Sequence, residues 1–184
     1  MYNHPAPSAG RINRAIFGNG NMDKIPKHIL ENATKRGKWV HESIEKIING
    51  DKYSGNWEWE SYIDAFKKFQ KDFEPEYIFT ELPIVSKDER TKGVIDALAK
   101  INGEYVLLDF KTSASTINHS WRMQLMIYHY ILKQEDDYPT PQSIRVVKLV
   151  RDGTYRILYY EYDEDVVESA LTLYEYMKEE DVLW

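Results

Sequence analysis

The dipeptide Asn102-Gly103, which separates two short apolar runs, constrains the fold of this chain more than any other feature. Asn-Gly is a strong signal for a two-residue β-hairpin turn, because both turn positions then need a left-handed backbone. The flanking runs, residues 92–100 and 104–110, are short and rich in β-forming residues. The sequence therefore predicts two antiparallel strands with a fixed register, in which Lys100 faces Tyr105.

The same register brings two carboxylates together, because it places Asp96 directly opposite Asp109. Directly opposed side chains have Cβ atoms about 5 Å apart, and like charges so placed destabilise a sheet. A divalent cation would offset that repulsion. Period-two alternation puts Lys111 on the face of Asp109, beside the same site. The alternative stays open that these charges lie at a solvated strand end, because a slip of one residue would separate the two acids.

The rest of the chain predicts an α/β fold. Hydrophobic periodicity of 3.6 indicates helices, and short β-rich runs indicate strands. The expected helices cover residues 33–49, 57–72, 117–134 and 163–180, and the expected strands cover residues 77–85, 92–100, 104–110, 143–150 and 154–162. The order α-α-β-β-β-α-β-β-α is typical of a central sheet with helices on its faces.

The length of 184 residues favours a single domain over residues 1–184. Within it we expect a loop-rich N-terminal arm over residues 1–25 with a short helix near Ile12 to Ile16. A core over residues 33–162 and an acidic C-terminal segment over residues 163–184 follow.

Composition excludes several classes of site and partner. The chain has no cysteine, which excludes disulfides, zinc-thiolate sites, iron–sulfur clusters and thiol nucleophiles. No apolar run is long enough for a membrane span, and the N-terminus lacks a signal-peptide core, so we expect a soluble protein of the cytoplasm without a membrane partner.

The net charge is −6, but residues 1–40 carry seven Lys and Arg against two Asp and Glu. This early segment is the candidate track for an anionic polymer. Its candidate nucleic-acid-binding residues are Arg11, Arg14, Lys35, Arg36 and Lys38.

Four stretches together resemble a known family. The segment "GVIDALAKINGEYVLLDFKTS" is similar to the active-site hairpin of the PD-(D/E)XK nuclease superfamily, with Asp96 as the first acid and Asp109 and Lys111 as the D/E-x-K triplet. "RGKWVHESIE" resembles the helix of the RecB-like branch that carries a metal-facing histidine, here His41. "QLMIYHY" resembles its Gln-x-x-x-Tyr motif, with Gln124 and Tyr128. "FTELPI" matches a strand that often carries an acid, here Glu81.

The resemblance implies a restriction-endonuclease-like core with a central mixed β-sheet flanked by helices, and a Mg²⁺ or Mn²⁺ cofactor. His41, Asp96, Asp109 and the backbone carbonyl of Phe110 are then the expected metal ligands. Lys111 is expected to orient the attacking water or to stabilise charge at phosphorus. Glu81 would bind a second metal or act through water, and Gln124 and Tyr128 would brace the site or touch the DNA backbone. His119 and His129 are not expected to take part.

The implied activity is hydrolysis of DNA phosphodiesters. Without an iron–sulfur cluster or room for a helicase, the chain resembles stand-alone exonucleases of the phage or mitochondrial genome-maintenance type. Such an enzyme would act on DNA ends with single-stranded character in recombination and repair. Two alternatives remain: a structure-specific or restriction-type endonuclease, and a non-catalytic module on the same fold that binds nucleic acid or protein. No residue marks a protein partner.

Overall fold

The computed structural model describes residues 5–18, 24–113 and 119–180. In chain order its elements are α1 (Ala9–Phe17), α2 (Lys27–Ile48), α3 (Glu60–Phe73), β1 (Glu76–Val85), β2 (Lys92–Ile101), β3 (Glu104–Lys111), α4 (His119–Lys133), β4 (Ser143–Leu149), β5 (Tyr155–Tyr160) and α5 (Glu164–Glu179). Every strand expected from the sequence is present, with ends that differ by at most two residues. Residues 117 and 118 of the expected fourth helix lie outside the described residues.

The five strands form one mixed sheet in the order β1-β2-β3-β4-β5. Neighbouring strands are antiparallel except β3 and β4, which run parallel. The predicted hairpin register is confirmed, since Ile101 pairs with Glu104 and Lys100 pairs with Tyr105. Asn102 and Gly103 both have positive φ, at 52° and 87°, as a two-residue hairpin turn requires. The fold is therefore α/β with a central mixed sheet, as expected.

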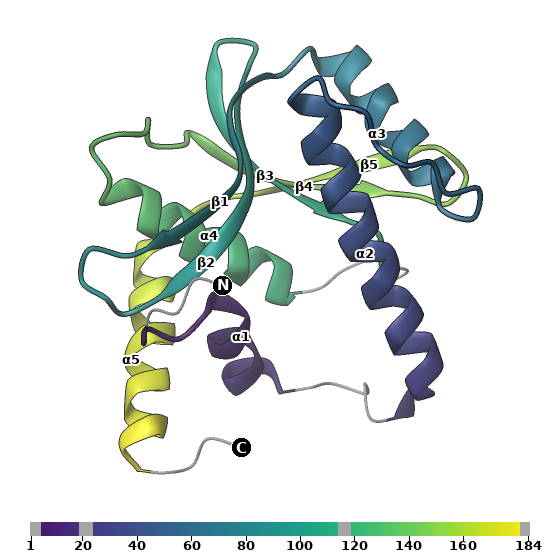
Figure 1. The fold of residues 1–184 in the computed structure, drawn as a ribbon. Coiled ribbons are helices and arrows are strands. Elements are labelled where there is room, and N and C mark those ends of the chain that lie inside the picture. The colour runs from purple at the N-terminus through teal and green to yellow at the C-terminus, as the bar shows by residue number, and fades with distance from the viewer. Residues whose placement is uncertain (1–4, 19–23, 114–118, 181–184) are drawn as a thin grey trace.

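Helices cover both faces of the sheet (Figure 1). Buried side chains of α1, α4 and α5 form one hydrophobic cluster with strand residues such as Leu107. Buried side chains of α2 and α3 form the other cluster, with strand residues such as Leu108 and Phe110. Successive residues of β3 thus contribute to opposite layers, as the pleat dictates. The hydrophobic core lies in these two layers, and the sheet between them is rigidly held.

Two helices are longer than the sequence pattern indicated. α2 begins at Lys27 rather than near residue 33. The sequence pattern does not indicate its first turns, because they are solvent-exposed and carry no buried apolar residue. α1 covers Ala9–Phe17, and Ala9 and Ile12 are fully buried against α4 and α5. The described part of the expected arm is therefore packed into the core rather than loose. No described helix combines the length and the apolar character that a membrane span needs.

Candidate active site and metal centre

Three acids lie side by side across three adjacent strands. The register of β1 with β2 places Glu81 opposite Asp96. The register of β2 with β3, continued one residue beyond its last pair, places Asp96 opposite Asp109. The flanking pairs are Thr80 with Ala97, Leu82 with Ile95, and Ala97 with Leu108. The pairing of β1 with β2 thus extends the predicted pair of acids to a row of three.

The β2–β3 ladder ends where the acids begin. Instead of a backbone partner, the N–H of Phe110 donates to Oδ2 of Asp96 at 2.8 Å. Asp96 is 9% exposed and Asp109 is 1% exposed, so water solvates the row poorly at this point. Like charges at adjacent register positions repel. The row therefore needs positive charge beside it.

His41, from the middle of α2, supplies part of that charge. Its Nε2 lies 2.9 Å from the carbonyl oxygen of Phe110, and its Nδ1 lies 3.1 Å from Oε1 of Glu81 and 3.6 Å from Oδ2 of Asp96. The carbonyl of Phe110 only accepts, so Nε2 carries a proton in this contact, and a protonated ring would also donate from Nδ1 to Glu81. Burial lowers the pKa of His41, but the charges of Asp96 and Glu81 outweigh it and raise the pKa to about 9.

Glu81 reaches this cluster through an unusual backbone conformation. It has a positive φ of 48° although it lies inside a strand. Non-glycine residues in the left-handed region are uncommon and carry strain, which concentrates at functional sites. The side chains of His41 and Glu81 are 26% and 27% exposed, so the cluster opens to solvent on their side.

Asp109 begins a second chain of contacts that runs into α4. Its Oδ1 accepts from Nζ of Lys111 at 2.6 Å, and the same Nζ lies 3.4 Å from Oε1 of Gln124. Nε2 of Gln124 donates to the hydroxyl of Tyr128 at 2.9 Å. Gln124 and Tyr128 are one helical turn apart on one face of α4. These contacts connect Gln124 and Tyr128 to Lys111 and Asp109, within the site that they were predicted to brace.

Burial and charge set the protonation of this pair. Burial raises the pKa of Asp109 above its ordinary value, opposed by the ammonium of Lys111 and assisted by Asp96. For Lys111, burial lowers the pKa, but the charges of Asp109 and Asp96 outweigh it and the pKa is raised. Lys111 is therefore a cation at neutral pH rather than a proton acceptor.

Gly93 on β2 sets the position of Tyr128. A Cβ atom at residue 93 would lie 2.3 Å from Cε1 and 3.0 Å from Cζ of the Tyr128 ring. Tyr128 is only 5% exposed, so its ring has little room to move away. Only glycine lets this ring lie against the strand. The sequence motifs do not single out Gly93, and a glycine inside a strand pattern is the signal that could have found it.

The site fits a divalent cation by the chemistry of its donors. Among the described residues, one imidazole nitrogen and two carboxylate oxygens, from His41, Glu81 and Asp96, lie within 4.8 Å of one another. Asp109 is not in that group, but its Oδ2 is buried without a hydrogen-bond partner. The carbonyl of Phe110, a predicted ligand, accepts from His41 instead. Carboxylates, a carbonyl and an imidazole are suited to Mg²⁺ or, with the imidazole, Mn²⁺.

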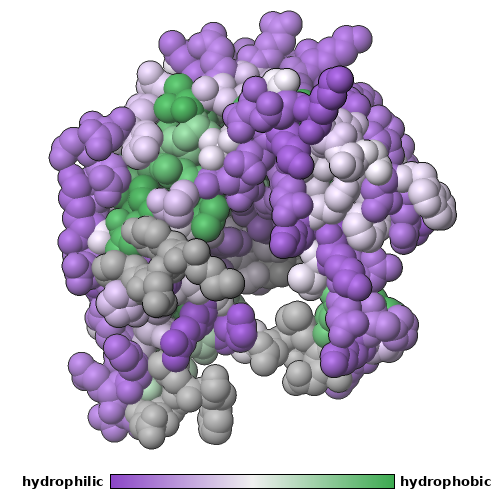
Figure 2. All heavy atoms as spheres, in the orientation of Figure 1, coloured by the Kyte–Doolittle hydropathy of each residue, from purple (hydrophilic) through white to green (hydrophobic). Residues whose placement is uncertain are grey.

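Two cavities lie near the end of β3, and Lys111 lines one of them. One, of about 480 Å³, lies between α1 and α4 and is lined by Arg14, Lys111 and Gln124, among others. A second, of about 350 Å³, is lined by Arg36, Thr112 and Lys148, among others. In the space-filling view, residues of hydrophilic type cover much of the visible surface outside the grey residues (Figure 2).

The remaining predicted cations lie on exposed helix surface. Lys35 and Lys38 are exposed on α2, where Lys38 lies 3.7 Å from Glu42 one turn away. Arg11 is exposed on α1, three residues before Arg14. The structure thus brings Arg14 and Arg36 to cavities near Lys111, while the other three cations line neither cavity.

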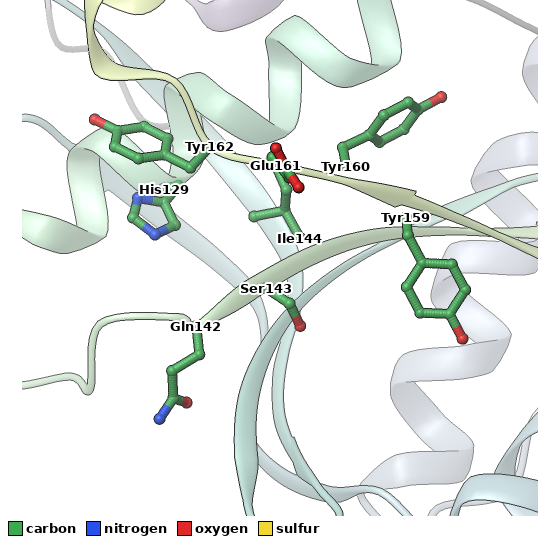
Figure 3. Close-up of a pocket in the computed structure, with 8 residues that line it drawn as sticks. All are labelled: His129, Gln142, Ser143, Ile144, Tyr159, Tyr160, Glu161 and Tyr162. Carbon is green, nitrogen blue, oxygen red and sulfur yellow. The ribbon is translucent and has the colours of Figure 1, made fainter.

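Another cavity, of about 550 Å³, lies at the start of β4, at the opposite end of this strand from Lys148 (Figure 3). It is lined by His129, Ser143 and Tyr162, among others. The ring of His129 stacks on Tyr162 with 3.9 Å between ring centroids. Figure 3 shows the two side chains next to each other. His129 thus packs inside the fold, away from the row of acids.

The family model of the PD-(D/E)XK nuclease superfamily matches residues 58–181. The chain belongs to this superfamily. No curated protein sequence matches it. Among solved structures, the fold is similar to that of LHK-Exo, an alkaline exonuclease from Laribacter hongkongensis. One crystal structure of LHK-Exo, in complex with dAMP, gives a TM-score of 0.55 at 14% identity, covering 96% of this chain and 89% of that one. A second gives 0.53 at 13% identity, covering 96% and 93%.

A crystal structure of a Eubacterium rectale protein gives a TM-score of 0.53 at 13% identity, covering 93% of this chain and 77% of that one. At these identities the likeness to solved structures shows the fold alone. The PD-(D/E)XK match spans the hairpin acids, Lys111, Gln124 and Tyr128, but His41 and Arg36 precede it. The roles of His41 and of the basic residues therefore rest on the geometry of this chain.

Proposed function

We propose that this PD-(D/E)XK protein is a Mg²⁺- or Mn²⁺-dependent deoxyribonuclease, and specifically an exonuclease that acts at DNA ends. The observation that carries the proposal is the row of Glu81, Asp96 and Asp109 across three strands, with His41 on one side and Lys111 on the other. A fold that needed only stability would not gather three carboxylates at a poorly solvated point.

Glu81, Asp96 and the neutral imidazole of His41 would hold the metal, so metal binding would displace a ring proton of His41. Asp109, through its unpartnered Oδ2, and the carbonyl of Phe110, once released from His41, are the further proposed donors. A bound cation supplies a Lewis acid that polarises a phosphoryl oxygen and lowers the pKa of water. Glu81 is thereby proposed as a ligand of the same cluster as His41. The rigid sheet fixes these donors before substrate arrives.

Lys111 has the charge and the anchoring that stabilisation of a phosphoryl group requires. Its ammonium is held by Asp109 and Gln124, so it reaches the substrate without reorganising. Its raised pKa keeps it positive. Gln124 and Tyr128 act through Lys111 and are positioning residues.

DNA is the proposed substrate because cations flank the site on both sides, Arg14 by α1 and Arg36 by α2. Lys35, Lys38 and Arg11 would extend this track over the exposed helix surfaces. The preference for ends and for single strands, and a place in recombination or repair in a phage or cell, are the finer parts of the proposal. The name of LHK-Exo, an alkaline exonuclease, supports only the preference for ends, and by analogy of fold alone.

The test compares circular single-stranded DNA with the same DNA linearised and end-labelled, each with Mg²⁺, Mn²⁺ or EDTA. An exonuclease degrades the linear DNA in either metal, spares the circle and is inactive in EDTA. Lys111→Ala should lose activity, whereas Lys100→Ala, on the same hairpin near its turn, should keep it. Cleavage of the circle would identify an endonuclease. A folded wild-type protein that is inert with both metals would identify a binding module.

A further inference from the structure

The cavity of about 350 Å³ on the α2 side of Lys111 has an unusual lining. Cationic residues from three separate segments are among those that line it: Arg36 from α2, Lys148 from β4, and Arg151 from the turn after β4. None of the described residues that line it is acidic. A concave surface with this charge is suited to an anion.

Arg36 is held in place before any ligand arrives. Its Nε donates to Oγ1 of Thr112 at 3.3 Å, and its guanidinium lies over the ring of Tyr62, 5.4 Å from the ring centroid. Thr112 takes only one of the five N–H donors of a guanidinium. A planar donor fork fixed in this way is suited to phosphate oxygens.

Ser113 supplies a second observation that points to a ligand. Its Oγ is buried and has no hydrogen-bond partner among the described residues, although the residue lines the cavity. Buried polar atoms without a partner are rare in folded proteins and call for an explanation. Serine hydroxyls are common donors to phosphate oxygens in protein–DNA complexes.

The position of the cavity connects it to the proposed reaction. Thr112 and Ser113 are the two residues that follow Lys111, and Lys148 is the register partner of Lys111 on the parallel strand β4. An anion held here lies next to the site, on the side away from α1. Successive phosphates of one DNA strand provide such neighbouring anions.

We infer that Arg36, Ser113 and Arg151 form a binding subsite for one backbone phosphate of the DNA strand, adjacent to the phosphate that is cut. The inference rests on the proposed function, because it takes the ligand to be DNA. The subsite holds the strand in register while the neighbouring bond is hydrolysed. Its ligand is a phosphodiester, so it reads no base.

The first experiment measures binding of a fluorescein-labelled oligo-dT in EDTA, over a series of salt concentrations. Arg151→Gln and Arg36→Gln should each weaken binding about tenfold and lower the slope of log affinity against log salt by about 0.7. Lys178→Gln, an exposed cation on α5, should leave both unchanged. Thermal unfolding confirms folding, and Arg151, exposed in a turn, is the variant least able to disturb it.

The second experiment identifies the phosphate. A neutral methylphosphonate is moved along the oligonucleotide one linkage at a time. Wild-type protein should lose affinity most at one linkage beside the cut site, and the Arg36→Gln, Arg151→Gln double variant should lose that sensitivity. Wild-type protein that binds and degrades DNA, with variants that keep the wild-type salt slope and linkage sensitivity, would overturn the subsite alone. Wild-type protein that neither binds nor degrades DNA would overturn the proposed function and the subsite together.

Discussion

Two histidines in this molecule make the same kind of hydrogen bond, but their pKa values are shifted in opposite directions. Nε2 of His41 donates to the carbonyl of Phe110 at 2.9 Å, and Nε2 of His129 donates to the carbonyl of Pro141 at 2.9 Å. Both side chains are largely enclosed by the fold. Yet the pKa of His41 is raised to about 9, whereas burial lowers the pKa of His129 below its ordinary value.

The difference lies in what faces the other ring nitrogen. Nδ1 of His41 faces Glu81 and Asp96, whereas Nδ1 of His129 is buried without a hydrogen-bond partner among the described residues, and its ring stacks on Tyr162. A carbonyl contact alone therefore does not raise the pKa of a histidine. The neighbouring acids raise the pKa of His41, because their charges favour the protonated imidazole.

Among the substitutions that test this contrast, removal of the charge of Asp96 beside His41 should have the largest effect on activity. Asp96→Asn should lower nuclease activity by at least about a hundredfold, because it removes a proposed ligand from the centre of the row. It should also abolish the stabilisation that Mn²⁺ gives the wild-type protein, about 2.7 kcal/mol at a metal concentration of 100 Kd. End-labelled DNA degradation and thermal unfolding with and without Mn²⁺ measure the two effects.

The metal-free stability separates loss of the site from loss of the fold. The side-chain carbonyl that Asp96→Asn introduces can still accept from the N–H of Phe110, so the free energy of unfolding should change by less than about 1 kcal/mol. Asp64→Asn, an exposed acid on α3, is the matched control and should change neither activity nor the response to Mn²⁺. An Asp96→Asn protein that Mn²⁺ still stabilises as strongly as the wild type would rule out Asp96 as a ligand.

An intermediate effect is expected when Gln124 and Tyr128, which hold Lys111 in position, are disturbed. Gly93→Ala would place a methyl group 2.3 Å from the ring of Tyr128 and displace it. Overpacking of this kind costs about 1–3 kcal/mol. Because Tyr128 positions Gln124 beside Lys111, activity should fall roughly ten- to a hundredfold. Denaturant unfolding and initial degradation rates measure both losses.

A second substitution tests whether the Tyr128 ring is the cause. Combining Gly93→Ala with Tyr128→Leu should destabilise less than the sum of the two single variants, because the ring that causes the clash is absent. Gly37→Ala is the control for glycine replacement, since no heavy atom lies within 4 Å of its added Cβ, and it should stabilise α2 by up to about 1 kcal/mol. Strictly additive losses would show that Gly93 does not act through Tyr128.

The sequence is sufficient to predict the hairpin and insufficient to predict the side-chain clusters around it. Asn102-Gly103 determines the register, and that register by itself aligns Asp96 with Asp109. Such local signals work because turn chemistry acts over a few residues. The membership of Glu81 in the His41 cluster depends on a strained backbone at one position, which no local preference predicts.

Longer-range features are also out of reach of the sequence. That Lys148 lies beside Lys111 depends on β4 running parallel to β3, with a helix and a loop between them. Nothing in the strand "SIRVVKLV" specifies its partner. The contact between Gly93 and Tyr128 likewise joins a strand to a helix that follows much later in the chain. Tertiary packing creates these pairs, so only the structure reveals them.

The smallest effect is expected for His129, and it concerns the pH dependence of the free energy of unfolding. The folded pKa of His129 is lowered, so below the unfolded value of about 6.5 the unfolded chain binds the proton more readily than the folded one. The contribution of His129 is therefore fully present above pH 6.5 and is lost as pH falls through the folded pKa, with a slope of at most about 1.4 kcal/mol per pH unit. His129→Gln should remove this slope.

Denaturant unfolding of the wild type and of His129→Gln between about pH 5 and pH 8 isolates the effect as a difference. The free energy of unfolding of the wild type minus that of His129→Gln should be constant above about pH 6.5 and should become smaller below it. His41 contributes with the opposite sign and in another window, because a raised pKa gives stability that is lost as pH rises from 6.5 towards 9. A difference that widens as pH falls would mean that His129 is protonated in the folded protein, and the two histidines would then not be the contrasting pair their surroundings indicate.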